Sequence, residues 1–138
     1  MAALIDLAVN SKNGHVALGS IAERNEISPQ YLEQVFASLR RAGIVKSVKG
    51  SQGGYLLKYP SSSITVASII QALEGTYYLD DEETKTEESA AGIAETIQED
   101  IVDRVNHGLD QILQNLTLAD LEESFQERQS GGQEMYYI

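Results

Sequence analysis

Apolar residues recur at helical spacing through the first quarter of the chain. They predict the end of an amphipathic helix over 3–11 and a turn over 11–14. A second, shorter helix is predicted over 18–25, with Ile21 and Ala22 on its inward face. The chain therefore begins with two short helices joined by a turn.

A third helix is marked at both ends. Ser28 suits an N-cap and Pro29 the first helical position, and apolar residues then follow at spacings of three and four. Gly43 suits the end of this helix. The solvent-facing positions near its start are Gln30, Tyr31, Glu33 and Gln34.

The period changes after this third helix. Residues 44–49 alternate and are rich in β-branched side chains, and residues 55–59 return to a strand pattern that Pro60 ends. Three glycines lie in the intervening segment 50–54. The pattern predicts a β-hairpin with a flexible, glycine-rich tip.

The second half of the chain begins with a short helix that Thr65 can cap and Gly75 can close. The composition then becomes acidic over 76–92, which predicts a solvated linker. From Ile93 to Leu116, apolar residues recur mostly every four positions, which predicts a helix of about 22 residues and about 33 Å.

This long helix exceeds what a core of this size needs, so we expect part of its apolar stripe to face a second subunit. The residues expected at that dimer interface are Ile97, Ile101, Val105, Leu109 and Ile112. Thr117 is expected to cap a short last helix over 118–125, and a polar tail follows it.

The order helix, helix, turn, helix and two-stranded hairpin is that of a winged helix-turn-helix. The predicted fold class is mainly α with a small β-hairpin: a winged helix-turn-helix plus a long C-terminal dimerisation helix. We expect a DNA-binding domain over 1–75, an acidic linker over 76–92, dimerisation helices over 93–125 and a C-terminal tail over 126–138.

The charge is distributed unevenly along the chain. The net charge of −11 taken alone argues against a nucleic-acid binder. However, residues 1–75 carry +2 and residues 76–138 carry −13, so the negative charge lies in the second half of the chain. Residues 40–58 contain five basic groups and no acid. This local positive patch favours DNA binding by the first half of the chain.

The polar positions of the third helix and the hairpin suggest how DNA would be read. The start of the third helix would enter the major groove, and the small basic hairpin tip suits the minor groove. Residues expected near base edges or at the helix N-terminus are Ser28, Gln30, Tyr31, Glu33 and Gln34. Residues expected at phosphates or in the minor groove are Arg40, Arg41, Lys46, Lys49, Ser51 and Gln52.

The residue inventory excludes several other classes of protein. The chain has no cysteine, which removes disulfides, thiolate metal sites and thiol nucleophiles. His15 and His107 have no neighbouring ligand set, and the acids at 80–83 do not match a calcium loop. We therefore expect no enzyme activity, no metal and no cofactor. No membrane-length apolar run or signal peptide is visible, so we expect a cytoplasmic bacterial protein.

Three segments carry a resemblance to a known family. Ser-Pro-Gln-Tyr-Leu-Glu-Gln at 28–34, Leu-Arg-Arg-Ala-Gly-Ile-Val at 39–45, and the run from 47 to 57 with its Gly-Gly-Tyr resemble the Rrf2 family of bacterial winged-helix repressors. The resemblance implies a homodimer with the long helix at its interface and two wings on a dyad-symmetric operator.

The chain departs from that family in two places. Cluster-bearing members place three cysteines after the helix that ends here at Gly75, whereas this chain has none, so we expect no iron–sulfur sensor. Members also usually begin about ten residues earlier, with a basic segment that contains serine and tyrosine, so Met1 lies inside their first helix. We expect part of the DNA contact surface to be missing if the start is native.

The cysteine-free members that repress cysteine metabolism fit best, because their acidic middle and Met-Phe-Tyr-Ile ending resemble this chain. That resemblance implies a repressor of sulfur-uptake and cysteine-synthesis genes, with cysteine synthase as its protein partner. The expected partner-binding tail is Tyr136, Tyr137 and Ile138, whose terminal carboxylate cysteine synthase can capture. The alternative is that this tail folds back onto the dimer core.

Two other functions stay open at this point. One is a repressor controlled directly by a small molecule, bound between the long helix and the winged domain. The other is an interaction adaptor that acts through the long helix and tail and does not bind DNA. A ligand-induced rise in melting temperature would favour the first, and the second predicts no salt-dependent DNA binding.

Overall fold

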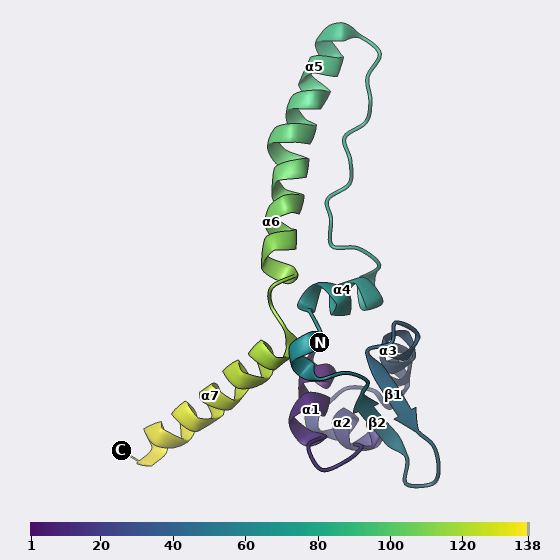
Figure 1. Cartoon of the computed structure of the whole chain (residues 1–138), viewed down its shortest axis with the longest axis vertical. Coiled ribbons are helices and arrows are strands. Elements are labelled where there is room, and N and C mark those ends of the chain that lie inside the picture. The colour runs from purple at the N-terminus through teal and green to yellow at the C-terminus, as the bar shows by residue number, and fades with distance from the viewer. Residues whose placement is uncertain (138) are drawn as a thin grey trace.

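Three helices and a β-hairpin form the lower body of the molecule in Figure 1, which is drawn from a computed structural model. The structure describes the backbone of residues 1–137 and the side chains of residues 1–131. The body contains α1 (Ala2–Asn10), α2 (Leu18–Asn25), α3 (Pro29–Arg41), β1 (Val45–Val48) and β2 (Gly54–Leu57). The predicted helix, helix, helix, hairpin order is therefore confirmed.

The core of the body lies where these helices converge on one face of the hairpin. Its largest fully buried side chains come from every helix of the body, with Phe36 at the centre against the ring of Tyr55, 4.8 Å between centroids. The others are Leu4, Leu7, Ile21, Leu32, Leu39, Val45, Ile69 and Leu118. Burying such side chains contributes about 1.5–3 kcal/mol each before chain entropy is counted, so this cluster positions α3 firmly.

The two strands pair antiparallel, with Val45 opposite Leu57 and Val48 opposite Gly54. An isolated β-bridge lies at the edge of this sheet, because Val16 exchanges two backbone hydrogen bonds with Tyr55, at 3.0 and 2.9 Å. The hairpin is thereby tied to the segment between α1 and α2. This pairing joins residues about forty apart and was not predicted from the sequence.

The chain leaves the hairpin through a 3₁₀ turn, η1 (Ser61–Ser63), and enters α4 (Val66–Glu74), whose N-cap is Thr65 as predicted. The chain later returns to the same point. Leu118 N–H donates to the carbonyl of Ile64 at 2.8 Å, and Val66 N–H donates to that of Leu116 at 2.7 Å. The long helix is therefore rooted beside the start of α4.

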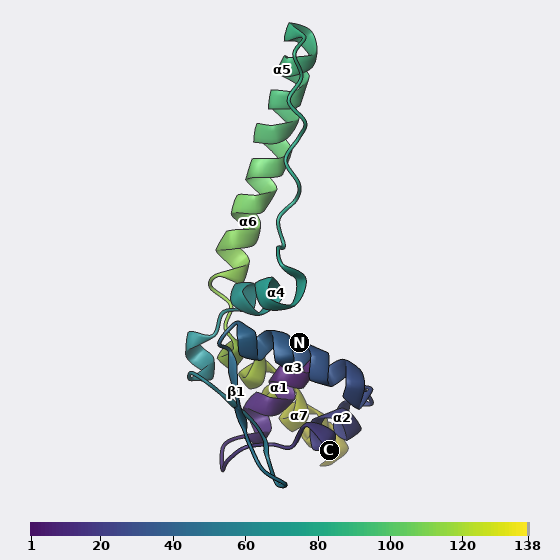
Figure 2. The same cartoon turned by 90° about the vertical axis from the view of Figure 1, so that its right-hand side faces the viewer.

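A single long rod rises from the body in Figures 1 and 2. It consists of α5 (Glu88–Ile97), a π-helical segment η2 (Gln98–Asp103) and α6 (Arg104–Leu113). In an α-helix, apolar residues spaced by four drift about 40° per step around the axis. The wider π-turn in the middle reduces that drift. The predicted long helix is therefore present as this continuous rod, and only its π-helical segment was not predicted.

The acidic segment after α4 does not hang free. It runs beside the rod in both views, and side chains of the rod hold it there. Tyr77 and Tyr78 each donate a hydroxyl to Asp110, at 2.5 and 2.7 Å, and Leu79 exchanges two hydrogen bonds with Asn106. We call residues 76–87 the strap. The helix begins at Glu88, so the linker expected over 76–92 ends at 87 instead of 92. The strap also makes hydrogen bonds to the rod, which the expected solvated linker did not include.

The last helix, α7 (Leu118–Tyr137), begins with Thr117 and Asp120 capping one another and extends from the body as an arm. Buried Glu122 anchors its base through Lys12, at 2.6 Å, and Ser61. The expected end at 125 was wrong, because the Gln, Glu and Arg residues beyond it are good helix formers. The side chains of Tyr136 and Tyr137, and all of Ile138, lie outside the described residues. Among the residues described, no helix is long and apolar enough to cross a membrane.

Candidate nucleic-acid interface

The start of α3 presents a row of polar side chains to solvent. Ser28 caps the helix by accepting from Tyr31 N–H at 3.4 Å, and Pro29 occupies the first turn. Gln30, Glu33 and Gln34 are exposed, and Tyr31 is 61% exposed. Their predicted exposure is confirmed.

The turn between α2 and α3 sets the angle of that presentation. Glu26 closes α2 in a left-handed backbone conformation, at φ 53° and ψ 44°, and Ile27 N–H donates to the carbonyl of Ala22. A residue with a Cβ is strained in this region. Packing of Ile27 against the core holds the turn in place despite that strain.

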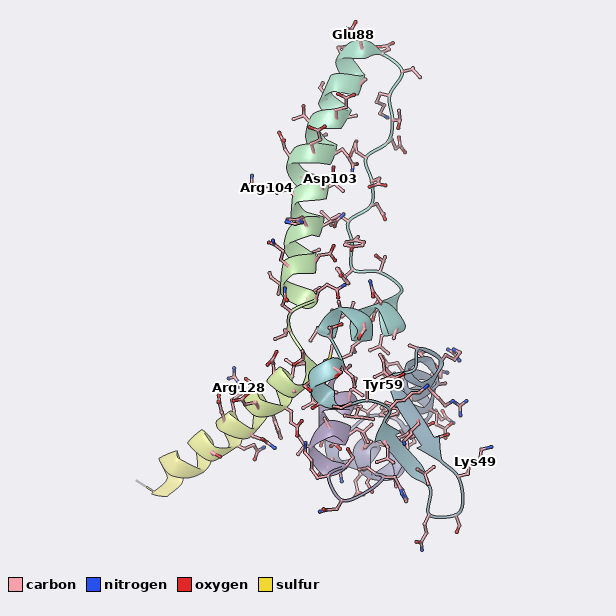
Figure 3. The ribbon with its side chains drawn as sticks, in the orientation of Figure 1. Lys49, Tyr59, Glu88, Asp103, Arg104 and Arg128 are labelled. Atoms are coloured by element: carbon pink, nitrogen blue, oxygen red, sulfur yellow. The ribbon has the colours of Figure 1, made fainter. Side chains whose placement is uncertain are left out.

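The hairpin is the wing of the fold, and its position depends on a close backbone approach. A Cβ on Gly54 would lie 2.3 Å from the carbonyl oxygen of Val16, so only glycine permits the bridge between Val16 and Tyr55. Lys49 points outward near the tip of this wing, at the opposite end of the molecule from Glu88 (Figure 3). Ser51 and Gln52 are exposed at the tip.

The cations of the body fall into two groups. Lys12 and Arg24 are committed to structural ion pairs, with Glu122 at 2.6 Å and with Asp6 at 2.7 Å. Within the described part of the chain, none of the five basic residues over 40–58 makes an ion pair. These are Arg40, Arg41, Lys46, Lys49 and Lys58, and all five are exposed. They are free to meet phosphates.

Asp6, the partner of Arg24, belongs to one of these structural ion pairs. Burial raises the pKa of its carboxyl, but hydrogen bonds from Arg24, Asn25 and Asn10 outweigh burial, and the net pKa is lowered. This network ties α1 to α2 beneath the helix-turn-helix. It borders a groove of about 990 Å³ between α1 and α7, where Ile5, Val9 and Phe125 supply apolar surface.

The eleven residues predicted to contact DNA lie on two elements. Ser28, Gln30, Tyr31, Glu33, Gln34, Arg40 and Arg41 belong to α3 or its cap, and Lys46, Lys49, Ser51 and Gln52 belong to the wing; all eleven are exposed. The structure brings each set together on its own element. Contact with DNA stays a prediction for all of them.

The apolar stripe of the rod is open to solvent in the single chain. Ile101 is 51% exposed, Val105 41% and Ile112 64%, while Ile97 and Leu109 are half-buried. Ala94 and Val102, on the same rod, are buried. Large apolar side chains in such a row are typical of a protein interface.

The sequence did not predict that His15 lies at this surface. His15 Nε2 lies 2.5 Å from the carbonyl oxygen of Gln52 at the wing tip. Nothing in the local pattern signals this contact, because it depends on the bridge between Val16 and Tyr55.

Comparison with known proteins decides the family. The model of the Rrf2 family, described as "Iron-dependent Transcriptional regulator", matches residues 1–124. The chain belongs to the Rrf2 family. It is 38% identical over 119 residues to an HTH-type transcriptional regulator of Neisseria meningitidis, covering 86% of this chain and 79% of that protein. It is therefore a DNA-binding transcriptional regulator of a non-enzymatic family.

Solved structures extend the agreement to the whole fold. CymR, the global cysteine regulator of Bacillus subtilis, superposes with a TM-score of 0.72 at 36% identity, covering 88% of each chain. IscR of T. potens gives 0.67 at 38% identity, covering 93% of this chain and 83% of that one. The predicted similarity to the Rrf2 family and to its cysteine regulators is confirmed.

The family's iron dependence does not fit the residues of this chain. No cysteine is present to supply thiolate ligands. In the part of the chain that the structure describes, no three His, Asp or Glu side chains gather as a metal site. After α4, where cluster-bearing members place cysteines, the chain has instead the tyrosines that bind Asp110. No step proposed below passes through iron.

Proposed function

We propose that the chain is a homodimeric transcriptional repressor that recognises a dyad-symmetric operator. The N-terminal turns of α3 read base edges in the major groove, and the wing tip enters the minor groove. One observation carries this proposal: the start of α3 and the wing both expose polar side chains, and the five cations of residues 40–58 are exposed with no carboxylate partner among the described residues.

The dimer part of the proposal rests on the rod. Its exposed stripe at Ile101, Val105 and Ile112 needs a partner surface, and a second copy supplies an identical one. A two-fold axis at the rods would present two α3 helices to one face of DNA. Half-sites would then be separated by one helical turn or a multiple of it.

The regulated genes are proposed to be those of cysteine and sulfur metabolism, with cysteine synthase as co-regulator. The similarity to CymR, named as a global cysteine regulator, supports the first part. The residues Met-Tyr-Tyr-Ile at 135–138 support the second, because they resemble the Met-Phe-Tyr-Ile of the family's cysteine-free cysteine regulators.

Selection of bound fragments from a sheared genome, with and without cysteine synthase, tests this function. The proposal predicts dyad-symmetric sites near sulfur genes, enriched more strongly when the synthase is present. Enrichment that ignores the synthase would contradict the co-regulator and leave the repressor. Absence of any enrichment would contradict DNA recognition itself, and a chain lengthened to the usual start of the family serves as the control.

Direct control by a small molecule is the second candidate, and the groove between α1 and α7 is the observation that favours it. Arg24 and Asp6 supply charge there, beside the exposed ring of Phe125. The groove differs from the expected position between the rod and the winged domain. A rise in melting temperature with free amino acids, lost in Phe125→Asp, would support this candidate over cysteine synthase.

A further inference from the structure

A side chain from outside the hairpin holds the wing tip. His15 donates its Nε2–H to the backbone carbonyl of Gln52 at 2.5 Å. Within the tip, Gly53 N–H donates to the carbonyl of Gly50 at 3.1 Å. Among the described residues, no other side chain from outside the hairpin hydrogen-bonds to residues 49–53.

The position of His15 is fixed by its neighbour. Val16 exchanges backbone hydrogen bonds with Tyr55 at 3.0 and 2.9 Å, so the segment before α2 runs alongside β2. Val16 is buried, whereas His15 is exposed. Because the bridge is antiparallel, Ala17 is the neighbour of Val16 nearer the tip, and His15 lies on the other side, so its imidazole reaches back toward the tip to meet Gln52. The imidazole therefore adds a side-chain contact at Gln52, two residues before β2 begins at Gly54.

We infer that His15 is a positioning residue for the wing: its hydrogen bond to Gln52 orders and aims the tip that enters the minor groove. This inference rests on the proposed DNA contact by the wing. His15 itself need not touch DNA. Because the acceptor is a backbone carbonyl, the contact does not depend on which side chain stands at position 52.

Physical reasons make such a contact useful here. The minor groove is only about 6 Å wide, so a tip that swings away misses it. The tip contains glycines, and Gly50 has a φ of +119°, so the segment is intrinsically free to adopt many conformations. Ordering each residue on binding costs conformational entropy, and a tip that is already ordered avoids much of that cost.

The first test needs no DNA. Backbone order parameters from NMR relaxation are measured at Gly50, Ser51 and Gln52 in the native protein, His15→Ala and His15→Gln. Glutamine places an amide nitrogen about where Nε2 lies, so it keeps the donor. We expect rigid values, near 0.85, in the native protein and His15→Gln, and values below about 0.6 in His15→Ala. Equal values in all three proteins would overturn the inference.

The second test measures affinity for a selected operator. His15→Ala is expected to bind roughly 3- to 10-fold more weakly, which corresponds to the loss of one hydrogen bond, and His15→Gln to recover the native affinity. His107→Ala, the other histidine, is the matched control and is expected to leave affinity unchanged. In combination with Lys49→Ala, His15→Ala is expected to add little, because both act through the wing.

The outcomes separate this inference from the proposed function. An additive double variant, or a His15→Gln that stays weak, would overturn the role of His15 while DNA recognition stands. If the native protein itself shows no salt-dependent DNA binding, the proposed function fails, and the order parameters still decide whether His15 holds the tip.

Discussion

Glu26 occupies a backbone conformation that a residue with a side chain adopts only at a cost. At φ 53° it ends α2 and turns the chain into α3. Replacing it by glycine removes a strain of about 1 kcal/mol, so Glu26→Gly is expected to raise the free energy of unfolding by about 0.5–1 kcal/mol. Urea unfolding measures the change. Glu23→Gly, inside α2, is the control and is expected to lower it by about 1 kcal/mol.

Asp6 gives the body a dependence on pH. Its pKa in the folded chain is lowered by hydrogen bonds from Arg24 and Asn25, which outweigh the opposite effect of burial. A lowered folded pKa stabilises the fold above the unfolded value of about 3.9, and that stability is lost as pH falls through the folded pKa. Asp6→Asn is therefore expected to melt earlier at pH 7, with the difference shrinking below about pH 4. A difference that persists unchanged at pH 2 would contradict this account.

Replacing Gln34 by alanine and replacing Lys49 by alanine are expected to change DNA binding in different ways. Gln34→Ala should relax discrimination at one base position by about 1–3 kcal/mol, because a side chain at the start of α3 reads a base edge. Lys49→Ala should weaken binding to all sequences alike and reduce the salt slope by about 1. Salt titrations on operator and scrambled DNA measure both. An unchanged slope would remove the wing from the interface.

At the scale of elements, the parts that carry local signals were predictable. Ser28, Pro29 and Thr65 mark helix starts through caps that act within four residues, and alternation marks the hairpin. The strap, the π-turn and the β-bridge at Val16 were not predictable in this way. Each depends on contacts between residues far apart, such as Tyr78 with Asp110, that no local pattern encodes.

The strap offers a prediction at this scale. Asp110 accepts from both tyrosine hydroxyls, which lowers the pKa of its carboxyl and raises the pKa of Tyr78. Asp110→Ala removes the shared acceptor and is expected to release the strap, so a glutamate-specific protease should cut between 82 and 88 several-fold faster. The winged domain should keep its melting transition. Cleavage at the native rate would show that the other bonds of the strap suffice.

At the scale of the whole molecule, the protein separates a basic reading end from an acidic rod. Lys49 and Glu88 mark the two ends in Figure 3. The acidic residues of the strap and rod repel the DNA backbone and leave the α3 and wing surface as the favourable approach. The overall charge of −11 is therefore compatible with a DNA-binding protein.

Dimer formation is the prediction at this scale. Ile101→Asp with Val105→Asp places two charges in the exposed stripe of the rod, so the doubly substituted chain is expected to sediment as a monomer. Its winged domain should stay folded, and its affinity for a two-half-site operator should fall by at least tenfold. Asp100→Lys, on the same rod, serves as the control. A dimer that survives the double change would place the interface elsewhere.

A dimethyl sulfate footprint on a selected operator tests recognition by two α3 helices in one dimer, because methylation reports guanine N7 in the major groove and adenine N3 in the minor groove. We expect two patches of protected guanine N7, related by a dyad and separated by about 10 base pairs or a multiple, with protected adenine N3 beside each. A single patch, or protection confined to the minor groove, would contradict recognition by two α3 helices in one dimer.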